Sequence, residues 1–152
     1  MTLRPGDTAP DFALPDQHGT LMSLAGFRGK RAVVLYFYPR DETRGCTAEA
    51  CRFRDDFEVF QEAGAEVIGV SSDPVEAHAA FAAHHRLPFT LLADVDGAVR
   101  QRYGVERQLI LVPGRTTFVI DRQGVIRHVF SQLFDATRHV DEALRVVKRL
   151  TP

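Results

Sequence analysis

Apolar residues occur in short runs that predict buried β-strands. The longest run lies within residues 31–38, where Ala-Val-Val-Leu-Tyr-Phe follow one another without a charged residue. Such a run is typical of a central strand that is buried on both faces of a sheet. Shorter runs predict further strands at residues 65–70, 89–92, 115–120 and 125–130. The turn-forming residues 121–124 join the last two strands in a predicted hairpin.

Helical periodicity fills the segments between these strands. One helix is predicted over residues 46–63, and Gly64 is expected to end it. Its apolar side chains recur at intervals of three and four, which gives one buried face: Ala50, Phe53, Phe57 and Phe60. Residues 72–74, Ser-Asp-Pro, predict the start of a helix that continues to about residue 86. A short helix is expected near residues 96–103, and Asp135 can cap a last helix to residue 150.

The order of the elements predicts an α/β fold. Residues 11–22 indicate two short strands around a glycine turn, after which strands and helices alternate. This alternation favours helices that flank a mixed central β-sheet, partly antiparallel because of the late hairpin. It is the element order of a thioredoxin-like fold with an added N-terminal β-hairpin. The 152 residues show no repeat or linker, so we expect one domain over residues 1–152. We interpret the apolar residues 109–112 as core.

Composition and charge exclude several classes of protein. Hydrophobic residues make up 45% of the chain and charged residues 26%, which is typical of a globular protein and not of a disordered one. The formal net charge of −1 provides no basic field for nucleic acid. No apolar stretch among the first 40 residues is long enough to span a bilayer, and residues 1–10 lack the features of a secretory signal. We therefore expect a cytoplasmic protein without nucleic-acid or membrane partners.

The two cysteines, Cys46 and Cys51, carry the most informative chemistry. On the predicted helix Cys46 lies in the first turn, on the phenylalanine-bearing face, and Cys51 is rotated from it by about 140°. The free N–H groups and the positive dipole end of that turn favour a thiolate. The two Cα atoms of an intact helix would be about 8.6 Å apart, beyond the ~7 Å limit for a disulfide. The pair is therefore interpreted as a switched bond, which forms only when the helical turn unwinds.

The residues around Cys46 resemble the active-site signature of peroxiredoxins. Residues 39–46, Pro-Arg-Asp-Glu-Thr-Arg-Gly-Cys, match the pattern Pro-x-x-x-Thr-x-x-Cys. With Cys51 five residues later, the segment is similar to the Q branch, also called bacterioferritin comigratory proteins. Residues 5–16 and 112–121 match that branch too, so the resemblance covers essentially the whole chain. One departure is Arg44, where the family usually has proline.

The resemblance implies a thiol peroxidase that reduces hydrogen peroxide and organic hydroperoxides. Cys46 would attack the peroxide and become a sulfenic acid, and Cys51 would resolve it to an intrachain disulfide. Thioredoxin, or alternatively glutaredoxin, would reduce that disulfide. Thr43 would hydrogen-bond the thiolate and the peroxide, Arg115 would stabilise the charge on sulfur and departing oxygen, and Pro39 would shield the sulfur. Members of the branch are often monomers, although some form dimers.

Two other functions stay open on the sequence. A thioredoxin-like disulfide oxidoreductase fits the fold, although the spacing is Cys-x₄-Cys rather than Cys-x-x-Cys. A non-enzymatic redox sensor would use the same pair of thiols. Glu49 either braces an arginine or simply favours the first helical turn.

The remaining polar residues predict no cofactor and no metal. Three histidines on the predicted helix of residues 74–86 are interpreted as a solvated face, because no carboxylates follow at ligand spacing: His78, His84 and His85. The cysteines lack the two further ligands that zinc would need. Three arginines are also interpreted as solvated: Arg100, Arg102 and Arg107.

Overall fold

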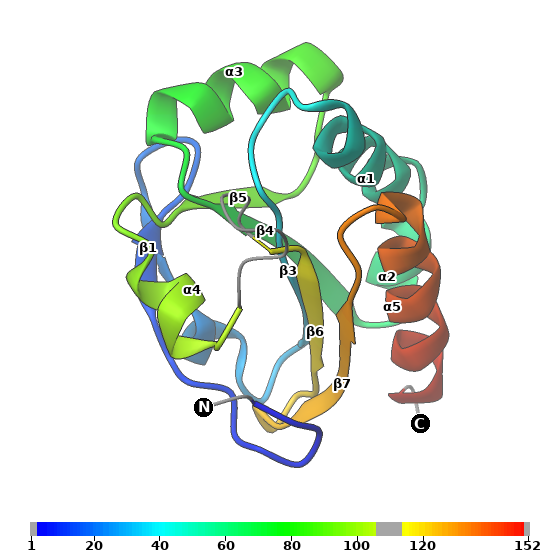
Figure 1. The fold of residues 1–152 in the computed structure, drawn as a ribbon. Coiled ribbons are helices and arrows are strands. Elements are labelled where there is room, and N and C mark those ends of the chain that lie inside the picture. The colour runs from blue at the N-terminus through cyan, green and yellow to red at the C-terminus, as the bar shows by residue number, and fades with distance from the viewer. Residues whose placement is uncertain (1–2, 106–113, 151–152) are drawn as a thin grey trace.

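The computed structural model describes residues 3–105 and 114–150. Its centre is a five-stranded mixed sheet with the strand order β5-β4-β3-β6-β7 (Figure 1). The strands are β3 (Ala32–Phe37), β4 (Ala65–Ser71), β5 (Thr90–Ala93), β6 (Thr116–Ile120) and β7 (Ile126–Ser131). Strands β3, β4 and β5 are parallel, whereas β6 runs antiparallel to β3 and to β7. The mixed α/β sheet expected from the sequence is therefore confirmed.

Strand β3 is buried along its whole length, as its apolar run predicts. Its side chains alternate between the two faces of the sheet, because successive residues of a strand point in opposite directions. Val34 and Tyr36 belong to the hydrophobic cluster on one face, while Val33, Leu35 and Phe37 belong to the cluster on the other. The hydrophobic core thus has two halves that share the same sheet.

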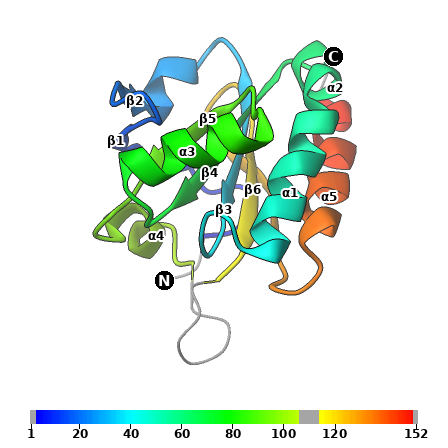
Figure 2. The same cartoon turned by 90° about the horizontal axis from the view of Figure 1, so that it is seen from above.

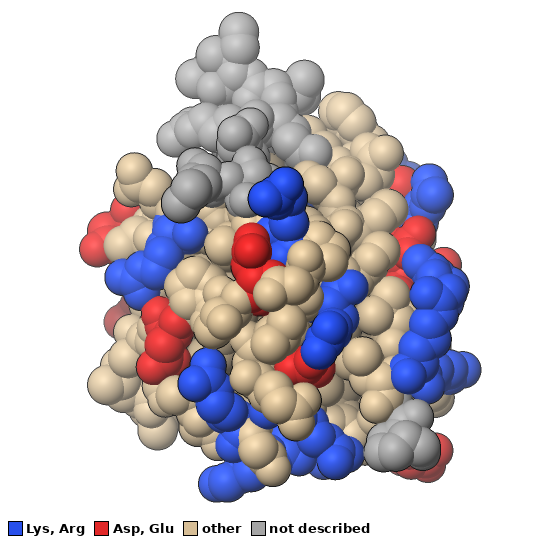
Figure 3. Space-filling model, turned by 90° about the horizontal axis from the view of Figure 1, so that it is seen from below, with Lys and Arg blue, Asp and Glu red and all other residues tan. Residues whose placement is uncertain are grey.

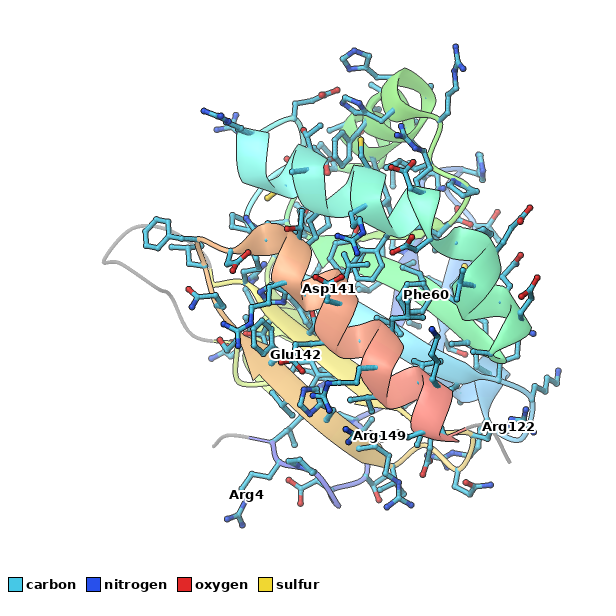
Figure 4. The ribbon with its side chains drawn as sticks, turned by 90° about the vertical axis from the view of Figure 1, so that its right-hand side faces the viewer. Arg4, Phe60, Arg122, Asp141, Glu142 and Arg149 are labelled. Carbon is cyan, nitrogen blue, oxygen red and sulfur yellow. The ribbon has the colours of Figure 1, made fainter. Side chains whose placement is uncertain are left out.

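Helices complete the layer on each side. The cluster around Tyr36 is covered by α1 (Arg44–Asp55), α2 (Phe57–Glu62) and α5 (Ala136–Leu150). Helices α1 and α5 lie side by side there (Figures 1 and 2), and Asp141, labelled on α5 in Figure 4, pairs with Arg52 of α1. Helix α3 (Val75–His85) contributes Phe81 to this cluster, and α4 (Ala98–Arg102) covers the opposite one.

The predicted N-terminal hairpin is confirmed. Strands β1 (Ala13–Pro15) and β2 (Leu21–Ser23) form a separate antiparallel pair, and a short 3₁₀ helix, η1 (Leu24–Phe27), follows. The carboxylate of Asp16 closes the turn between the strands, because it accepts hydrogen bonds from the N–H groups of His18 and Thr20.

The single helix expected over residues 46–63 is wrong in two respects. Helix α1 begins two residues earlier, at Arg44, and the helical segment breaks at Asp56, which ends α1 and precedes α2. Aspartate competes for local hydrogen bonds and favours helix ends over helix interiors. The apolar face is preserved across the break, since Phe53 and Phe60 are both fully buried.

The start of α3 also differs from the expectation, because Pro74 precedes the helix rather than forming its first turn. The Asp73 carboxylate does not cap the helix. It accepts hydrogen bonds from the hydroxyl of Ser71 and from the N–H of Asp41. A tertiary contact to the loop after β3 therefore replaces the predicted local one.

The prediction of solvated faces is wrong for two residues. His78 is fully buried, and its Nε2 donates a hydrogen bond to the carbonyl oxygen of Leu92. Arg100 donates hydrogen bonds to the carbonyl oxygens of Tyr38 and Gly114, and so links the segments that follow β3 and precede β6. In both cases the partner lies on another element, which periodicity alone does not reveal. Residues 107 and 109–112, for which predictions were also made, lie outside the described residues.

The surface mixes both signs of charge. On the face drawn in Figure 3, Lys and Arg side chains lie beside Asp and Glu side chains in several places. This agrees with the near-balance of 19 basic and 20 acidic residues in the sequence. Among the described helices, none has the length and apolar character that crossing a bilayer requires.

Candidate active site

Cys46 lies in the first turn of α1, which follows the loop at the carboxyl end of β3. Its side chain is 1% exposed and belongs to the buried cluster, as the helical periodicity predicts. The first hydrogen bond of the helix runs from the N–H of Thr47 to the carbonyl oxygen of Thr43, so the N–H groups of residues 44–46 precede the ladder. Such groups and the helix dipole favour an anion at this position.

Cys51 lies on the same helix but not beside Cys46. Both cysteines are free thiols, and Cys51 is half-buried, whereas Cys46 is buried. Because α1 is continuous through both positions, the two sulfurs occupy different sides of an intact helix. A disulfide between them therefore requires α1 to unwind, as the sequence geometry predicts.

Arg115 is the buried cation that faces Cys46. Its Nη2 lies 3.4 Å from Cys46 Sγ, and its Nε donates a hydrogen bond of 2.9 Å to the carbonyl oxygen of Leu133. The antiparallel pairing of Phe37 with Thr116 brings the start of β6 to the end of β3. This pairing joins two parts of the chain that are far apart in sequence.

Gly45 allows the guanidinium to approach α1. A Cβ atom at this position would lie 3.1 Å from Arg115 Nη2, which is closer than ordinary van der Waals contact. Any larger residue would therefore crowd the group that contacts the sulfur.

Glu49 holds the other side of the same guanidinium. It lies three residues after Cys46 on the same helical face, is fully buried, and its Oε1 accepts a hydrogen bond from Arg115 Nη1. Burial raises the pKa of Glu49 to about 8, although Arg115 counteracts part of this shift. The sequence offered the brace as one of two readings of Glu49, and its spacing from Cys46 was the available signal.

The protonation state of Glu49 determines which neighbouring anion the Arg115 guanidinium stabilises. With a pKa near 8, the Glu49 carboxyl is largely protonated at neutral pH. A neutral Glu49 leaves the positive charge of Arg115 available to an anion at the Cys46 sulfur, 3.4 Å away. Two anions around one guanidinium would leave an uncompensated buried charge, which is costly in a low-dielectric interior.

His139 of α5 borders this cluster and was missed by the sequence analysis. Its Nδ1 lies 3.9 Å from Glu49 Oε2 and 2.8 Å from the hydroxyl of Thr117, while Nε2 donates to the carbonyl oxygen of Gln132. Burial lowers the pKa of His139 to about 4, so the ring is neutral and Nδ1 accepts the Thr117 hydrogen. No sequence pattern marks His139, because its partners lie on other elements.

A hollow of about 560 Å³ lies against the first turn of α1, and Gly45 lines it rather than the buried Cys46. Pro39, Thr43 and Arg115 all line it, so three of the predicted site residues converge there. Phe134 also lines it and is 80% exposed. The hydroxyl of Thr43 donates to the carbonyl oxygen of Arg40 at 2.8 Å, so its predicted bond to the thiolate stays a prediction.

The loop that leads into α1 is fixed by a buried hydrogen-bond network around Asp41. Asp41 accepts a hydrogen bond from the Tyr38 hydroxyl, and its other carboxylate oxygen lies 2.6 Å from His78 Nδ1. Its own N–H donates to Asp73. These contacts connect the loop to α3 and so hold the first turn of α1 in its folded position.

Among the described residues, neither cysteine belongs to a group of three or more potential metal ligands. The donors around Cys46 are an arginine and backbone N–H groups, which stabilise an anion and do not bind a cation. Fold and site together fit the class of thiol-based redox proteins on a thioredoxin-like scaffold, with a buried cysteine at a helix N-terminus.

Comparisons with known proteins give the same class. The AhpC/TSA family model matches residues 5–129. Peroxiredoxin Q of Sedum lineare, a chloroplastic protein, is 49% identical over 146 residues, which cover 95% of this chain and 78% of the relative. The crystal structure of peroxidoxin BcpB from Mycobacterium tuberculosis superimposes with a TM-score of 0.91 at 42% identity, covering 99% of both chains.

A third match is the bacterioferritin comigratory protein of Xanthomonas campestris, in structures that address its alkyl peroxide reduction activity. It has a TM-score of 0.85 at 28% identity and covers 93% of this chain and 92% of its own. The chain belongs to the AhpC/TSA family, and its relatives are peroxiredoxins of the Q type. It is therefore a thiol peroxidase, an enzyme that reduces peroxides and is regenerated by a thioredoxin-like reductant.

Proposed function

We propose that Cys46 is the nucleophile of this peroxidase and that Cys51 resolves the oxidised product. The Cys46 thiolate attacks one peroxide oxygen, the O–O bond breaks, and the other oxygen leaves as water or an alcohol after it takes up a proton. The sulfur, oxidised by two electrons, becomes a sulfenic acid. The Cys51 thiol then attacks this sulfur and releases water, which leaves an intrachain disulfide.

One observation carries this proposal: Arg115 Nη2 lies 3.4 Å from Cys46 Sγ while Glu49 and the Leu133 carbonyl fix the other guanidinium nitrogens. A guanidinium fixed in this way is organised before the reaction begins. It stabilises the thiolate and then the negative charge on the departing oxygen, and such a preorganised donor contributes about 2.7–4 kcal/mol.

Pro39 and Thr43 have supporting roles in the proposal. Pro39 lines the hollow against the first turn of α1 and limits the contact of the Cys46 sulfur with water. Thr43 is the N-cap residue of α1, and rotation of its side chain away from Arg40 would turn the hydroxyl toward bound peroxide. The alkyl peroxide reduction activity named for the Xanthomonas protein supports organic hydroperoxides as substrates in addition to hydrogen peroxide.

The resolving step requires a conformational change. Because α1 is continuous through Cys46 and Cys51, its first turn must unwind before the two sulfurs can meet. The disulfide formed then lies in a locally opened segment, where a dithiol reductant can reach it. We propose thioredoxin as that reductant, with glutaredoxin as the alternative.

Three further features belong to the proposal. Residues 1–152 form one domain, which the two core halves on a shared sheet support. The protein is a monomer, to be checked by light scattering. It works in the cytoplasm, where thiols stay reduced.

A coupled assay tests the proposed roles. Hydrogen peroxide consumption is followed with thioredoxin, thioredoxin reductase and NADPH for the wild type, Cys46→Ser and Cys51→Ser. We expect no turnover for Cys46→Ser. We also expect no thioredoxin-coupled turnover for Cys51→Ser, although this variant still consumes about one equivalent of peroxide. Full activity of Cys46→Ser would refute the nucleophile assignment, and normal cycling of Cys51→Ser would refute the resolving one. Rapid insulin reduction without peroxide would favour a disulfide oxidoreductase instead.

A further inference from the structure

Three side chains that commonly bind metals meet beside the loop that leads into α1. Glu42 lies in this loop, directly before the N-cap residue of the helix, and His84 and His85 are the last two residues of α3. His84 Nδ1 is 3.0 Å from Glu42 Oε2, and His85 Nε2 is 2.8 Å from Glu42 Oε1. Glu42 is 42 and 43 residues away from the two histidines in the chain, so only the fold brings this carboxylate close to them.

The distances fit a single small ion. One ligand atom from each residue lies within 4.8 Å of the other two. A zinc ion with bonds of about 2.0–2.1 Å places its tetrahedral ligands roughly 3.3 Å apart. Each imidazole nitrogen therefore needs to move away from the Glu42 carboxylate by only a few tenths of an ångström to accept an ion.

The donor set selects the class of metal. Two imidazole nitrogens with one carboxylate suit zinc and neighbouring transition metals, whereas magnesium and calcium prefer oxygen ligands only. An ion between them would replace the hydrogen bonds that His84 Nδ1 and His85 Nε2 now make to the Glu42 carboxylate. Three protein ligands leave a fourth position to water.

The site is both accessible and supported. The side chains of His84 and Glu42 are 67% and 46% exposed, so an ion can reach them from solvent. His85 is held more firmly, because its ring packs edge-on against Phe81 and its carbonyl oxygen accepts a hydrogen bond from Arg54 of α1.

A second group of potential ligands, Asp41, Asp73 and His78, does not offer a site. His78 Nε2 must donate to the carbonyl oxygen of Leu92, because a carbonyl only accepts, and His78 Nδ1 is engaged by Asp41. The Asp73 carboxylate accepts hydrogen bonds from Ser71 and from the Asp41 backbone. Unlike Glu42 and His84, His78 and Asp41 are buried, so an ion has no access to them from solvent.

We propose that Glu42, His84 and His85 form a binding site for one divalent transition metal ion of the zinc class. The ion connects the loop before α1 to the end of α3. This connection opposes unwinding of the first turn of α1, so metal binding slows formation of the Cys46–Cys51 disulfide. The effect on resolution rests on the proposed function, whereas the binding site does not.

The binding test uses the full chain without a histidine tag and with both cysteines replaced by serine, so that thiolates cannot bind the metal. Zinc chloride is titrated into this protein by calorimetry, and into the same protein with Glu42→Gln or with His84→Asn and His85→Asn together. We expect one zinc ion per chain and a loss of affinity of about tenfold or more in both variants. His18→Asn, which changes an exposed histidine in the turn between β1 and β2, is the matched control and should bind zinc like its parent.

Absence of saturable binding would overturn the proposal, and so would equal binding by the Glu42 and His84/His85 variants. A loss of the same size in His18→Asn would show non-specific binding and would also overturn it. Hydrogen exchange of the same cysteine-free protein tests the connection separately. Zinc should slow amide exchange in residues 40–47 of the parent and not of the His84/His85 variant. Unchanged exchange at saturating zinc would refute the effect on unwinding while leaving the site in place.

Discussion

Arg115 Nη2 lies 3.4 Å from Cys46 Sγ, although the two residues are 69 positions apart in the chain. The contact depends on two features of the fold. Antiparallel pairing of β6 with β3 delivers the arginine to the end of the sheet, and the first turn of α1 delivers the sulfur. Glu49 then fixes the guanidinium from the same helix that carries the cysteine.

Replacement of Arg115 by lysine should slow the reaction of Cys46 with hydrogen peroxide by about 10²–10³-fold, because lysine keeps a charge but loses the fixed fork of donors. The measurement is quenched-flow oxidation of Cys46 followed by mass spectrometry. Arg122→Lys is the matched control. Arg122 is exposed in the turn between β6 and β7, next to the C-terminal end of α5 and away from the first turn of α1 (Figure 4). Equal rates for the Arg115 variant and the wild type would show that the guanidinium does not assist the reaction.

Glu49→Gln should change the pH dependence of the same reaction. Glu49 is protonated below its pKa of about 8, which leaves the charge of Arg115 to the thiolate. Above pH 8 the carboxylate ionises, competes for the guanidinium and adds a buried negative charge beside the sulfur. Glutamine cannot ionise, whereas every other titratable group is the same in the variant and in the wild type. We therefore expect the ratio of wild-type to variant rate to fall by about tenfold between pH 7 and pH 9, which is ~1.4 kcal/mol. A ratio that does not change with pH would contradict this account of Glu49.

His139 should make the fold sensitive to acid. Burial lowers its pKa from 6.5 to about 4, so the unfolded chain binds a proton in this range that the folded chain does not. The free energy of unfolding therefore falls as the pH drops from about 6.5 to 4, by ~3 kcal/mol in total from this residue. Urea unfolding at pH 7 and pH 4.5 measures the effect. In His139→Gln the difference between the two pH values should shrink, and an unchanged difference would show that another group causes the acid sensitivity.

Gly45→Ala should separate helix stability from catalysis. Alanine favours the helical conformation by up to about 1 kcal/mol over glycine, but its Cβ would lie 3.1 Å from Arg115 Nη2. We expect a slower reaction with peroxide, because the guanidinium must shift, and slower disulfide formation, because the first turn of α1 resists unwinding. Gly26→Ala is the control, since a Cβ there has ordinary contact distances. A Gly45 variant with wild-type rates in both steps would contradict the close approach.

The features that the sequence could predict are the local ones. The apolar run of residues 32–37 marks a strand buried on both faces, and helical spacing places Cys46 on the buried face of α1. The same helical rotation places Cys51 on a different side of α1 from Cys46. Each of these depends on side chains within one element, where periodicity determines the direction in which they point.

The features that the sequence could not predict depend on contacts between elements. The resemblance pairs Arg115 with Cys46, yet only the position of β6 shows that Glu49 holds the same guanidinium. His78 was expected on a solvated face, and its partner Asp41 is 37 residues away. The break at Asp56 likewise interrupts a continuous apolar pattern that α1 and α2 both keep.

Mass spectrometry after one equivalent of hydrogen peroxide tests the division of roles between the two sulfurs most directly. In the wild type we expect a loss of about 2 Da, localised to a bond between Cys46 and Cys51. In Cys51→Ser we expect a gain of about 16 Da on Cys46, and in Cys46→Ser no change at the remaining thiol. The account would be contradicted if Cys51 in the Cys46→Ser protein gained oxygen as fast as Cys46 does in the Cys51→Ser protein.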